Sequence, residues 1–301
     1  VILLSTVRPP FCFCDARPKM GHTIPMRKTT CTIRALLLRA AVLAAVLPAL
    51  FQLLAHRQPP FHPGWAREDL SFLYGGRVLA AEDYSLLFRQ TGLGRAGVDQ
   101  LLSEGETGIA RILEIQDDFF SPARITCSSL NWPVREELRD SAAPSVPLLP
   151  GDVLLTFSTH TLGWRHGHAG LAVDTGITAE AVCIGSASAL VGAEHWNRYG
   201  TCIHLRLRSA PEEDREQIAR FALEALDGLP YRLTCGLLGQ KDGGGGAQCA
   251  WLVWRALWEA GYDADADGGR LVTVADLAAS PLFEVVQIRG IDPESFPSGP
   301  F

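Results

Sequence analysis

The sequence predicts an α+β fold in which helices pack on a mostly antiparallel sheet, preceded by an N-terminal membrane helix and a small helical region. Three observations lead to this prediction. An almost wholly apolar run occupies residues 36–54, short amphipathic segments lie between 57 and 140, and short alternating apolar runs follow Pro150. A spanning-length apolar run is typical of a membrane helix, whereas alternation with a period of two is typical of strands.

The apolar run is predicted to form a signal anchor or transmembrane helix at 35–55. Nineteen residues at about 1.5 Å per residue reach about the thickness of the hydrocarbon core, which is ~30 Å. Arg27, Lys28 and Arg34 precede the run, and positive charge on that side favours a cytoplasmic N-terminus at 1–34 with the rest of the chain outside. The predicted location is therefore the cell membrane, with a single pass and an extracytoplasmic C-terminal part.

Two alternatives to an uncleaved anchor stay open. Residues 55–60 lack the small-x-small pattern of a clean cleavage site, which favours an anchor over a removed signal peptide and a secreted protein. A buried core helix is the other alternative, although the flanking basic cluster would have no purpose in a core. Met26 stands directly before that cluster and is a candidate start, which would leave residues 1–25 untranslated.

The middle of the chain, at 57–140, is predicted to be a helical region. Short amphipathic segments around 85–88, 97–103 and 108–116 are joined by glycine-containing turns. Residues 141–150 are rich in Ala, Ser and Pro and are predicted to be a linker that marks a domain boundary.

The C-terminal domain is predicted at 151–292. Strands are expected at 152–157, 168–173, 179–184, 202–207 and 283–288, because apolar residues alternate there. Two helices interrupt them. The first is opened by Ser209, with the spacing of a capping box to Glu212, and is closed by Gly228. The second begins at Cys249, runs to Ala260 and is apolar nearly all round, which predicts a central position.

Charge and cysteine content limit the class of function. The 301 residues carry 27 Lys and Arg and a net charge of −6, which argues against a nucleic-acid-binding protein, because such proteins neutralise phosphates with basic side chains. The eight cysteines, at 12, 14, 31, 127, 183, 202, 235 and 249, show no repeated two-residue gap typical of zinc sites. We expect no nucleic-acid partner, no metal and no cofactor.

Cys249 is the candidate nucleophile. A thiol at the start of a helix lies at the positive end of the helix dipole, which stabilises a thiolate. Four glycines at 243–246 precede it and let the backbone approach a ligand closely. The backbone N–H of Cys249, and Gln248 beside it, are candidate donors to an oxyanion. By itself this signal is weak, because a lone helical cysteine is more often a buried core residue.

A second group of residues belongs with this cysteine. Gly-Asp opens the strand expected at 152–157, Gly-His-Ala-Gly spans 167–170, and Glu180 with an alanine after it follows His168 by twelve residues. This pattern resembles the NlpC-type papain-like cysteine hydrolases. The resemblance implies a papain-like fold in which His168 is the general base and Glu180 orients it.

The order of the motifs resembles the circularly permuted, YiiX-like branch of that family, which also includes relatives of lecithin:retinol acyltransferase. In that branch the nucleophile lies in a C-terminal helix, and Cys-Ala-Trp-Leu-Val at 249–253 fits the motif. Tyr231 matches a tyrosine that lies close to the oxyanion in the family. The resemblance covers about residues 150 to 262.

The roles of the candidate site residues follow from this resemblance and from the chemistry of thiols. His168 is expected to accept the thiol proton, Glu180 to fix the tautomer of His168 and stabilise its imidazolium, and Cys249 to attack a carbonyl. His166 is the rival base, and its alternative is a substrate-side histidine. In a tight hairpin Glu180 would not lie directly opposite His168, so its role depends on the family spacing. Asp152 is expected to end a turn or cap a loop.

The expected function is that of an extracytoplasmic, membrane-anchored cysteine hydrolase that cleaves amide bonds, with a peptide or peptidoglycan-like substrate, through an acyl-thioester. Two alternatives stay open. One is a lipid or ester hydrolase or acyltransferase of the same fold, and the other is an inactive binding module in which Cys249 is a core residue.

Overall fold

The computed structural model describes residues 27–54, 59–129, 133–140, 142–161, 163–237 and 240–296. Residues 1–25, for which an upstream extension was considered, lie outside this range. The chain divides into two compact units, residues 1–49 and 50–301, and each is described by itself.

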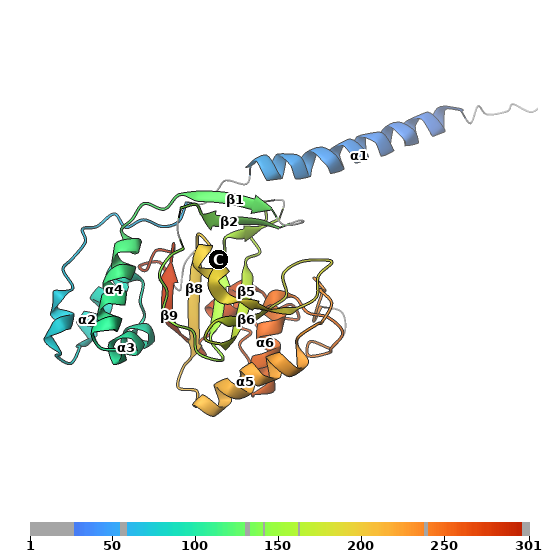
Figure 1. Ribbon diagram of the computed structural model, residues 1–301. Helices are drawn as coiled ribbons and strands as arrows, with labels where there is room; N and C mark the ends of the chain where they lie inside the picture. The colour runs from blue at the N-terminus through green and yellow to red at the C-terminus, as the bar shows by residue number, and fades with distance from the viewer. Residues whose placement is uncertain are drawn as a thin grey trace, which may run out of the picture. The chain divides into compact units, whose positions relative to one another are not determined.

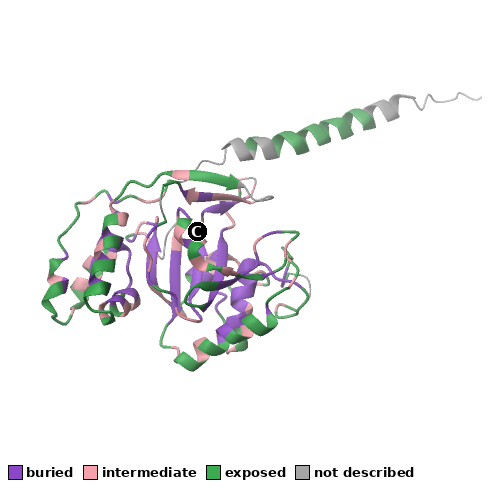
Figure 2. Cartoon of the chain, in the orientation of Figure 1, coloured by how far each residue is buried: buried purple, intermediate pink, exposed green. Residues whose placement is uncertain are grey.

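Most of helix α1, Arg27–Leu54, belongs to the N-terminal unit, so a helix is present where the apolar run predicts one. Its described apolar side chains, at 33–47 and 50, are exposed, including Leu36 to Leu38 at 64–70%, as the green part of α1 in Figure 2 shows. Among the described residues, no helix has the length and apolar character that crossing a membrane requires. The helix itself is present, whereas the prediction that 35–55 spans a membrane is unsupported.

The second unit is built on a six-stranded sheet, and its antiparallel character is as predicted. Every pair of neighbours in the order β7-β6-β5-β3-β8-β9 is antiparallel. The strands are β3 Val153–Thr156, β5 His168–Asp174, β6 Ile177–Glu180, β7 Ala189–Gly192, β8 Cys202–Leu207 and β9 Phe283–Arg289.

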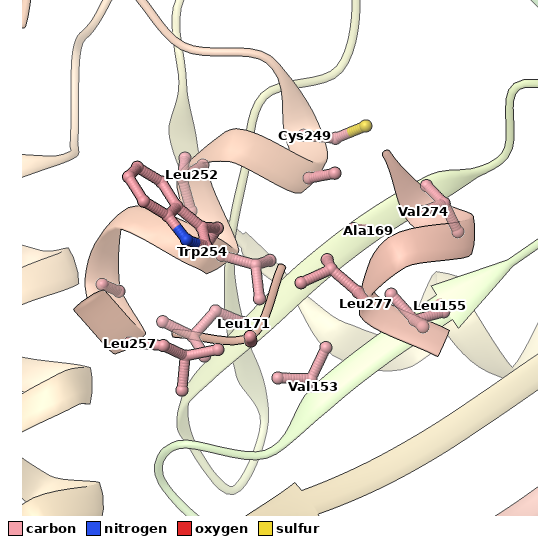
Figure 3. Packing of buried hydrophobic residues seen from close by; sticks show 14 of the residues in the cluster. Val153, Leu155, Ala169, Leu171, Cys249, Leu252, Trp254, Leu257, Val274 and Leu277 are labelled. Atoms are coloured by element: carbon pink, nitrogen blue, oxygen red, sulfur yellow. The ribbon is translucent and has the colours of Figure 1, made fainter. Parts of the chain in front are cut away.

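Two helices, α5 Glu212–Ala225 and α6 Cys249–Glu259, pack on β5 (Figure 1). Leu252 and Leu257 of α6 belong to the same buried core as Val153 and Leu171 of the sheet, part of which Figure 3 draws. A short helix, α7 Val274–Ala279, packs beside α6.

The predicted capping box at the start of α5 is wrong. Ser209 has φ +55° and lies in a turn before the helix, and Pro211 is the N-cap without a side-chain hydrogen bond. The helix begins at Glu212 itself, so Ser209 lies two residues before the N-cap.

The region at 57–140 is only partly helical. Its helices are η1 Ser71–Gly75, α2 Ala81–Thr91, α3 Arg95–Ser103 and α4 Glu106–Phe119. Two strands that the sequence analysis missed, β1 Ile125–Ser129 and β2 Val134–Leu138, form a second sheet with β4 Thr159–His160. These strands escape a search for alternating apolar residues because β1 carries mostly polar side chains.

The segment at 141–150 is not a free linker between two domains. Val146 is buried in the same core as the helices and Val286 of β9, and its N–H donates to Gln287 Oε1 at 2.9 Å. Gly97 of α3 lies so close to β9 that an added Cβ would be 2.2 Å from the Val286 carbonyl oxygen. Helices and sheet therefore form one unit, and the expected boundary does not separate them.

Candidate active site

Cys249 is the first residue of α6 and lines a cavity of about 600 Å³. Figure 3 shows its sulfur pointing away from Leu252 and Trp254, which pack in the core. N–H groups in the first turn of a helix have no acceptor within the helix, so the backbone N–H of Cys249 is placed to donate to a bound oxygen. The thiol is therefore at a cavity wall, although the residue is only 8% exposed.

His168 and Glu180 lie beside this thiol. His168 Nε2 is 2.7 Å from Glu180 Oε2, and the neighbouring Cys249 contributes to raising the pKa of His168. The Cys249 sulfur itself donates to Gln248 Oε1 at 3.6 Å. Since Nε2 is engaged by the carboxylate, Nδ1 is the ring nitrogen available to the sulfur. The structure thus brings together the three residues that the sequence analysis chose, although they are far apart in the chain.

The register of the sheet explains how Glu180 reaches His168. Leu171 pairs with Ala179, so Glu180 comes opposite Gly170 and not opposite His168, as the hairpin argument expected. The Glu180 side chain lies over Gly170: an added Cβ there would be 3.2 Å from Glu180 Cγ and 2.7 Å from Trp196 Cζ2. Gly170 therefore leaves the space through which the carboxylate meets the imidazole diagonally.

Three residues around Glu180 were not predicted from the sequence. Thr178 Oγ1 donates to Glu180 Oε1 at 2.6 Å, Trp196 Nε1 donates to the same oxygen at 2.7 Å, and His195 Nε2 lies 3.2 Å from it. The Trp196 ring also stacks on the imidazole of His168, with an interplanar angle of 7°. Thr178 could have been found from strand alternation, which places it on the same face as Glu180; Trp196 and His195, from the helix η2 Ala193–Arg198, carry no such signal.

Burial and hydrogen bonding oppose one another in setting the charges of this pair. Burial disfavours the charged imidazolium, but the neighbouring Cys249 and the hydrogen bond with Glu180 outweigh it and raise the pKa of His168 to about 9. Burial also disfavours the carboxylate, yet hydrogen bonds from His168 and His195 hold the pKa of Glu180 well below its usual value. The arrangement therefore favours an imidazolium next to a carboxylate.

His166, the rival base, lines the same cavity but lies elsewhere in the hydrogen-bond network. Its Nε2 is 3.0 Å from Thr161 Oγ1 and its Nδ1 is 2.8 Å from the Gly167 carbonyl oxygen. Burial lowers its pKa. The structure thus places His168, and not His166, between Glu180 and the thiol.

Tyr231 and Gln248 were predicted to lie near the oxyanion, and both line the cavity. Burial, together with the proximity of Cys249, raises the pKa of the Tyr231 phenol, which keeps its O–H as a donor. Gln248 has a different task from the expected one: its Oε1 accepts from the Ala250 N–H at 3.0 Å and its Nε2 donates to the Val272 carbonyl oxygen at 2.6 Å. It caps α6 beside the thiol, and its role as an oxyanion donor stays a prediction.

The cavity walls are mostly apolar. Ile184, Leu233 and Trp164 line the cavity and are themselves 52–63% exposed. Among the described residues that line it, none is Asp, Glu, Lys or Arg. Such a wall fits an apolar group better than a charged one.

Asp152, the other motif residue, lies in a separate buried network. Its carboxylate accepts hydrogen bonds from Arg206 at 2.7 and 2.8 Å and lies 2.7 Å from His204 Nε2. Its Oδ2 also accepts the Leu149 N–H, which closes the turn that the sequence analysis expected. Burial opposes the charge, but His204 and Arg206 lower the pKa of Asp152 to about 2.

Comparison with known proteins gives little guidance. No family model matches the chain, and no curated protein matches it. Among solved structures it is similar to the metalloprotein yiiX from Escherichia coli O157:H7, a DUF1105 protein, at 13% identity and a TM-score of 0.36, over 46% of this chain and 95% of that one. This likeness is too weak to support an argument about fold or activity.

Proposed function

We propose that this chain is a cysteine hydrolase in which Cys249 is the nucleophile, His168 the general base and Glu180 the residue that orients His168. The observation that carries the proposal is the hydrogen-bonded pair of the His168 imidazole and the buried Glu180 carboxylate beside the Cys249 thiol at a cavity wall. A carboxylate that accepts from Nε2–H leaves Nδ1 as the proton acceptor, which is the tautomer that a thiol requires.

The reaction proceeds in two steps through an acyl-thioester. His168 holds the proton of the Cys249 thiol at Nδ1 as an imidazolium, so the thiolate sulfur bonds to the substrate carbonyl carbon and the carbonyl oxygen becomes an oxyanion. The backbone N–H of Cys249 and the Tyr231 hydroxyl are the donors proposed for it. His168 then protonates the departing amine or alcohol, and in the second step it takes a proton from the water that hydrolyses the thioester.

The proposal extends to the NlpC-type papain-like family and its permuted, YiiX-like branch. Three features support this extension: His168 opens one strand, Glu180 closes the antiparallel neighbour of that strand, and Cys249 opens a later helix. The same order of base, orienting residue and nucleophile defines the resemblance in the sequence.

The substrate has two candidates. Cell-wall peptide amides are the first, from the family resemblance. An apolar acyl ester or amide, such as a lipid, is favoured by the cavity, since muropeptides carry charges that its described walls do not match. The exposed apolar side chains of Ile184 and Leu233 at the cavity would contact the acyl chain of such a substrate.

Turnover of a substrate series tests the proposal. We expect the full chain to hydrolyse p-nitrophenyl octanoate faster than the acetate ester, to leave muropeptides intact, and to lose turnover as Cys249→Ala. Intact-protein mass spectrometry should show an acyl adduct on the wild type and none on Cys249→Ala. Turnover that survives in Cys249→Ala would end the proposal, whereas cleavage of muropeptides alone would select the peptide substrate.

The remaining alternative is an inactive binding module, and the reactivity of the thiol distinguishes it. Cys127 is exposed and would itself react with iodoacetamide, so the experiment uses the Cys127→Ala variant. In that background we expect Cys249 to be alkylated at least tenfold faster than Cys235, which is buried and whose pKa burial raises to about 11. Equal rates at the two cysteines would favour the inactive module.

A further inference from the structure

Aspartates alternate along the segment that follows α6. Asp263, Asp265 and Asp267 are separated by single alanines and followed by Gly268, which matches the first six positions of the calcium-binding loop signature. Gly268 has φ +66°, the left-handed backbone that the sharp turn of such a loop needs. The glutamate at the twelfth position is missing, and Val274 stands there.

The fold supplies another carboxylate in its place. Oxygen atoms of Asp265, Asp267 and Asp276 all lie within 4.8 Å of one another. Ca²⁺ binds oxygen at about 2.3–2.6 Å, so ligand oxygens around one ion are at most about 5 Å apart. Asp276 belongs to α7, and one of its oxygens, Oδ2, accepts from the Thr273 N–H and hydroxyl, which fixes the side chain in place.

A separate observation concerns the hydrogen bonding of Asp265. Its side chain is 0% exposed, and its Oδ1 has no hydrogen-bond partner within the described part of the chain. The other oxygen, Oδ2, pairs with Lys241 Nζ. Burying a carboxylate oxygen without a donor costs free energy, and the carboxylates of Asp276 and Asp267 lie beside it. The cluster therefore holds more negative charge than Lys241 offsets.

We propose that Asp265, Asp267 and Asp276 bind one Ca²⁺ ion, with water completing its coordination. Oxygen-only ligands select a hard cation over zinc. One side of the cluster is exposed at Asp267, which admits the waters. Asp263 does not belong to this group of close carboxylates, and its Oδ1 accepts from Trp254 Nε1 at 2.8 Å. This assignment does not depend on the hydrolase reaction.

The ion would hold a segment that also forms the active-site cavity. Residues 271–274 lie between Asp267 and Asp276 and line that cavity. Within them, the Val272 carbonyl oxygen accepts from Gln248 Nε2 at 2.6 Å, and Gln248 caps the helix that Cys249 begins. Ca²⁺ at the aspartates would therefore fix both ends of the cavity wall that positions the thiol.

Calcium titration of the full chain tests the proposal without any measurement of hydrolysis. After treatment with EDTA and exchange into metal-free buffer, isothermal titration calorimetry should show one Ca²⁺ per chain with a Kd of about 10⁻⁴ M. About 1 mM Ca²⁺ should raise the Tm by about 2–5 °C, because a ligand that binds only the folded state stabilises it. Mg²⁺ should bind more weakly, since it loses its waters reluctantly.

Two variants make the result specific. Asp267→Asn changes an exposed side chain, so the variant should fold, and its Kd for Ca²⁺ should rise at least tenfold. Asp242→Asn, an exposed aspartate in the neighbouring glycine-rich segment and outside the cluster, should bind as the wild type does. Absence of heat and of a Tm shift in the wild type, or equal affinity in wild type and Asp267→Asn, would overturn the assignment.

Discussion

Replacing Glu180 with glutamine removes one charge and keeps the shape of the side chain. Its Oε1 accepts from Thr178 and Trp196, and its Oε2 accepts from His168 Nε2. All of these neighbours are donors, so the amide nitrogen of glutamine meets a donor wherever it points. Because Thr178 and Trp196 both donate on the Oε1 side and only His168 donates on the other, the glutamine oxygen should stay on the Oε1 side. We therefore expect the amide nitrogen to face His168.

The size of the effect follows from the tautomer of His168. A glutamine N–H that faces Nε2 requires Nε2 to accept, which moves the ring proton to Nδ1, the nitrogen nearest the thiol. His168 can then no longer take the proton of Cys249. A carboxylate-to-amide change that reverses the histidine tautomer in a Ser-His-Asp triad lowers kcat about 10⁴-fold, and we expect Glu180→Gln to lower kcat here by about 10³- to 10⁴-fold.

The variant should also change the pH dependence. The folded pKa of His168 is about 9, above its ordinary value of 6.5, so protonation of His168 stabilises the fold. This contribution is complete below pH 6.5 and is lost as the pH rises through about 9. Activity that needs the imidazolium to protonate the leaving group should therefore decline near pH 9 in the wild type. In Glu180→Gln, without the carboxylate, the decline should move to lower pH.

The assay is the pH profile of kcat and kcat/KM for an activated acyl ester, with the Tm recorded for each variant. Glu194→Gln is the matched control, because Glu194 is exposed and lies on η2 near the same network. A kcat for Glu180→Gln within threefold of wild type, while Cys249→Ala is inactive, would refute the orienting role. An equal loss in Glu194→Gln would show that any nearby charge has the same effect.

Three further predictions test other parts of the site. Gly170→Ala places a Cβ 2.7 Å from Trp196 Cζ2, and this overpacking should lower the free energy of unfolding by about 1–3 kcal/mol. It should also lower kcat about 10- to 100-fold by displacing the Glu180 carboxylate; ester kinetics and the Tm measure the two effects. Tyr231→Phe should lower kcat about 100-fold with little change in KM if its hydroxyl binds the oxyanion. Asp152→Asn breaks the buried contacts with Arg206 and His204 and should lower stability by about 3–5 kcal/mol, seen in urea unfolding, while the folded fraction keeps its kcat.

The central sheet was predictable in part from its short apolar runs. The strand predicted at 179–184 is Ile177–Glu180, and β7, Ala189–Gly192, was not predicted. Strand β8 has the predicted bounds, Cys202–Leu207, and β9 extends one residue beyond the predicted 283–288. The second sheet was not predictable in this way. Its strand β1, Ile-Thr-Cys-Ser-Ser, is held by pairing with its neighbour, which no local pattern shows.

The identities of the site residues were predictable to a larger extent than their contacts. The helix that starts at Cys249 follows from the glycines before it and the apolar residues after it. The pairing of Glu180 with His168 does not follow from strand spacing, because it depends on the missing side chain of Gly170 and on Trp196, which comes from a separate helix. The alternating aspartates at 263–267 do match a calcium-loop pattern, but a search for metal sites that considers only the spacing of cysteines does not detect it.

The two halves of the site are held by different kinds of structure, and this difference predicts how each responds to change. His168 and Glu180 lie on paired strands inside a network in which the carboxylate is fully supplied with donors, so changes there should alter proton transfer and its pH dependence. Cys249 is positioned by Gln248, which caps its helix and donates to the Val272 carbonyl oxygen. Val272 lies in the segment between Asp267 and Asp276, so the ends of that segment lie next to the aspartate cluster. Changes in that segment should instead move the thiol and the cavity wall, and so alter substrate binding and kcat together, without shifting the pH at which activity declines.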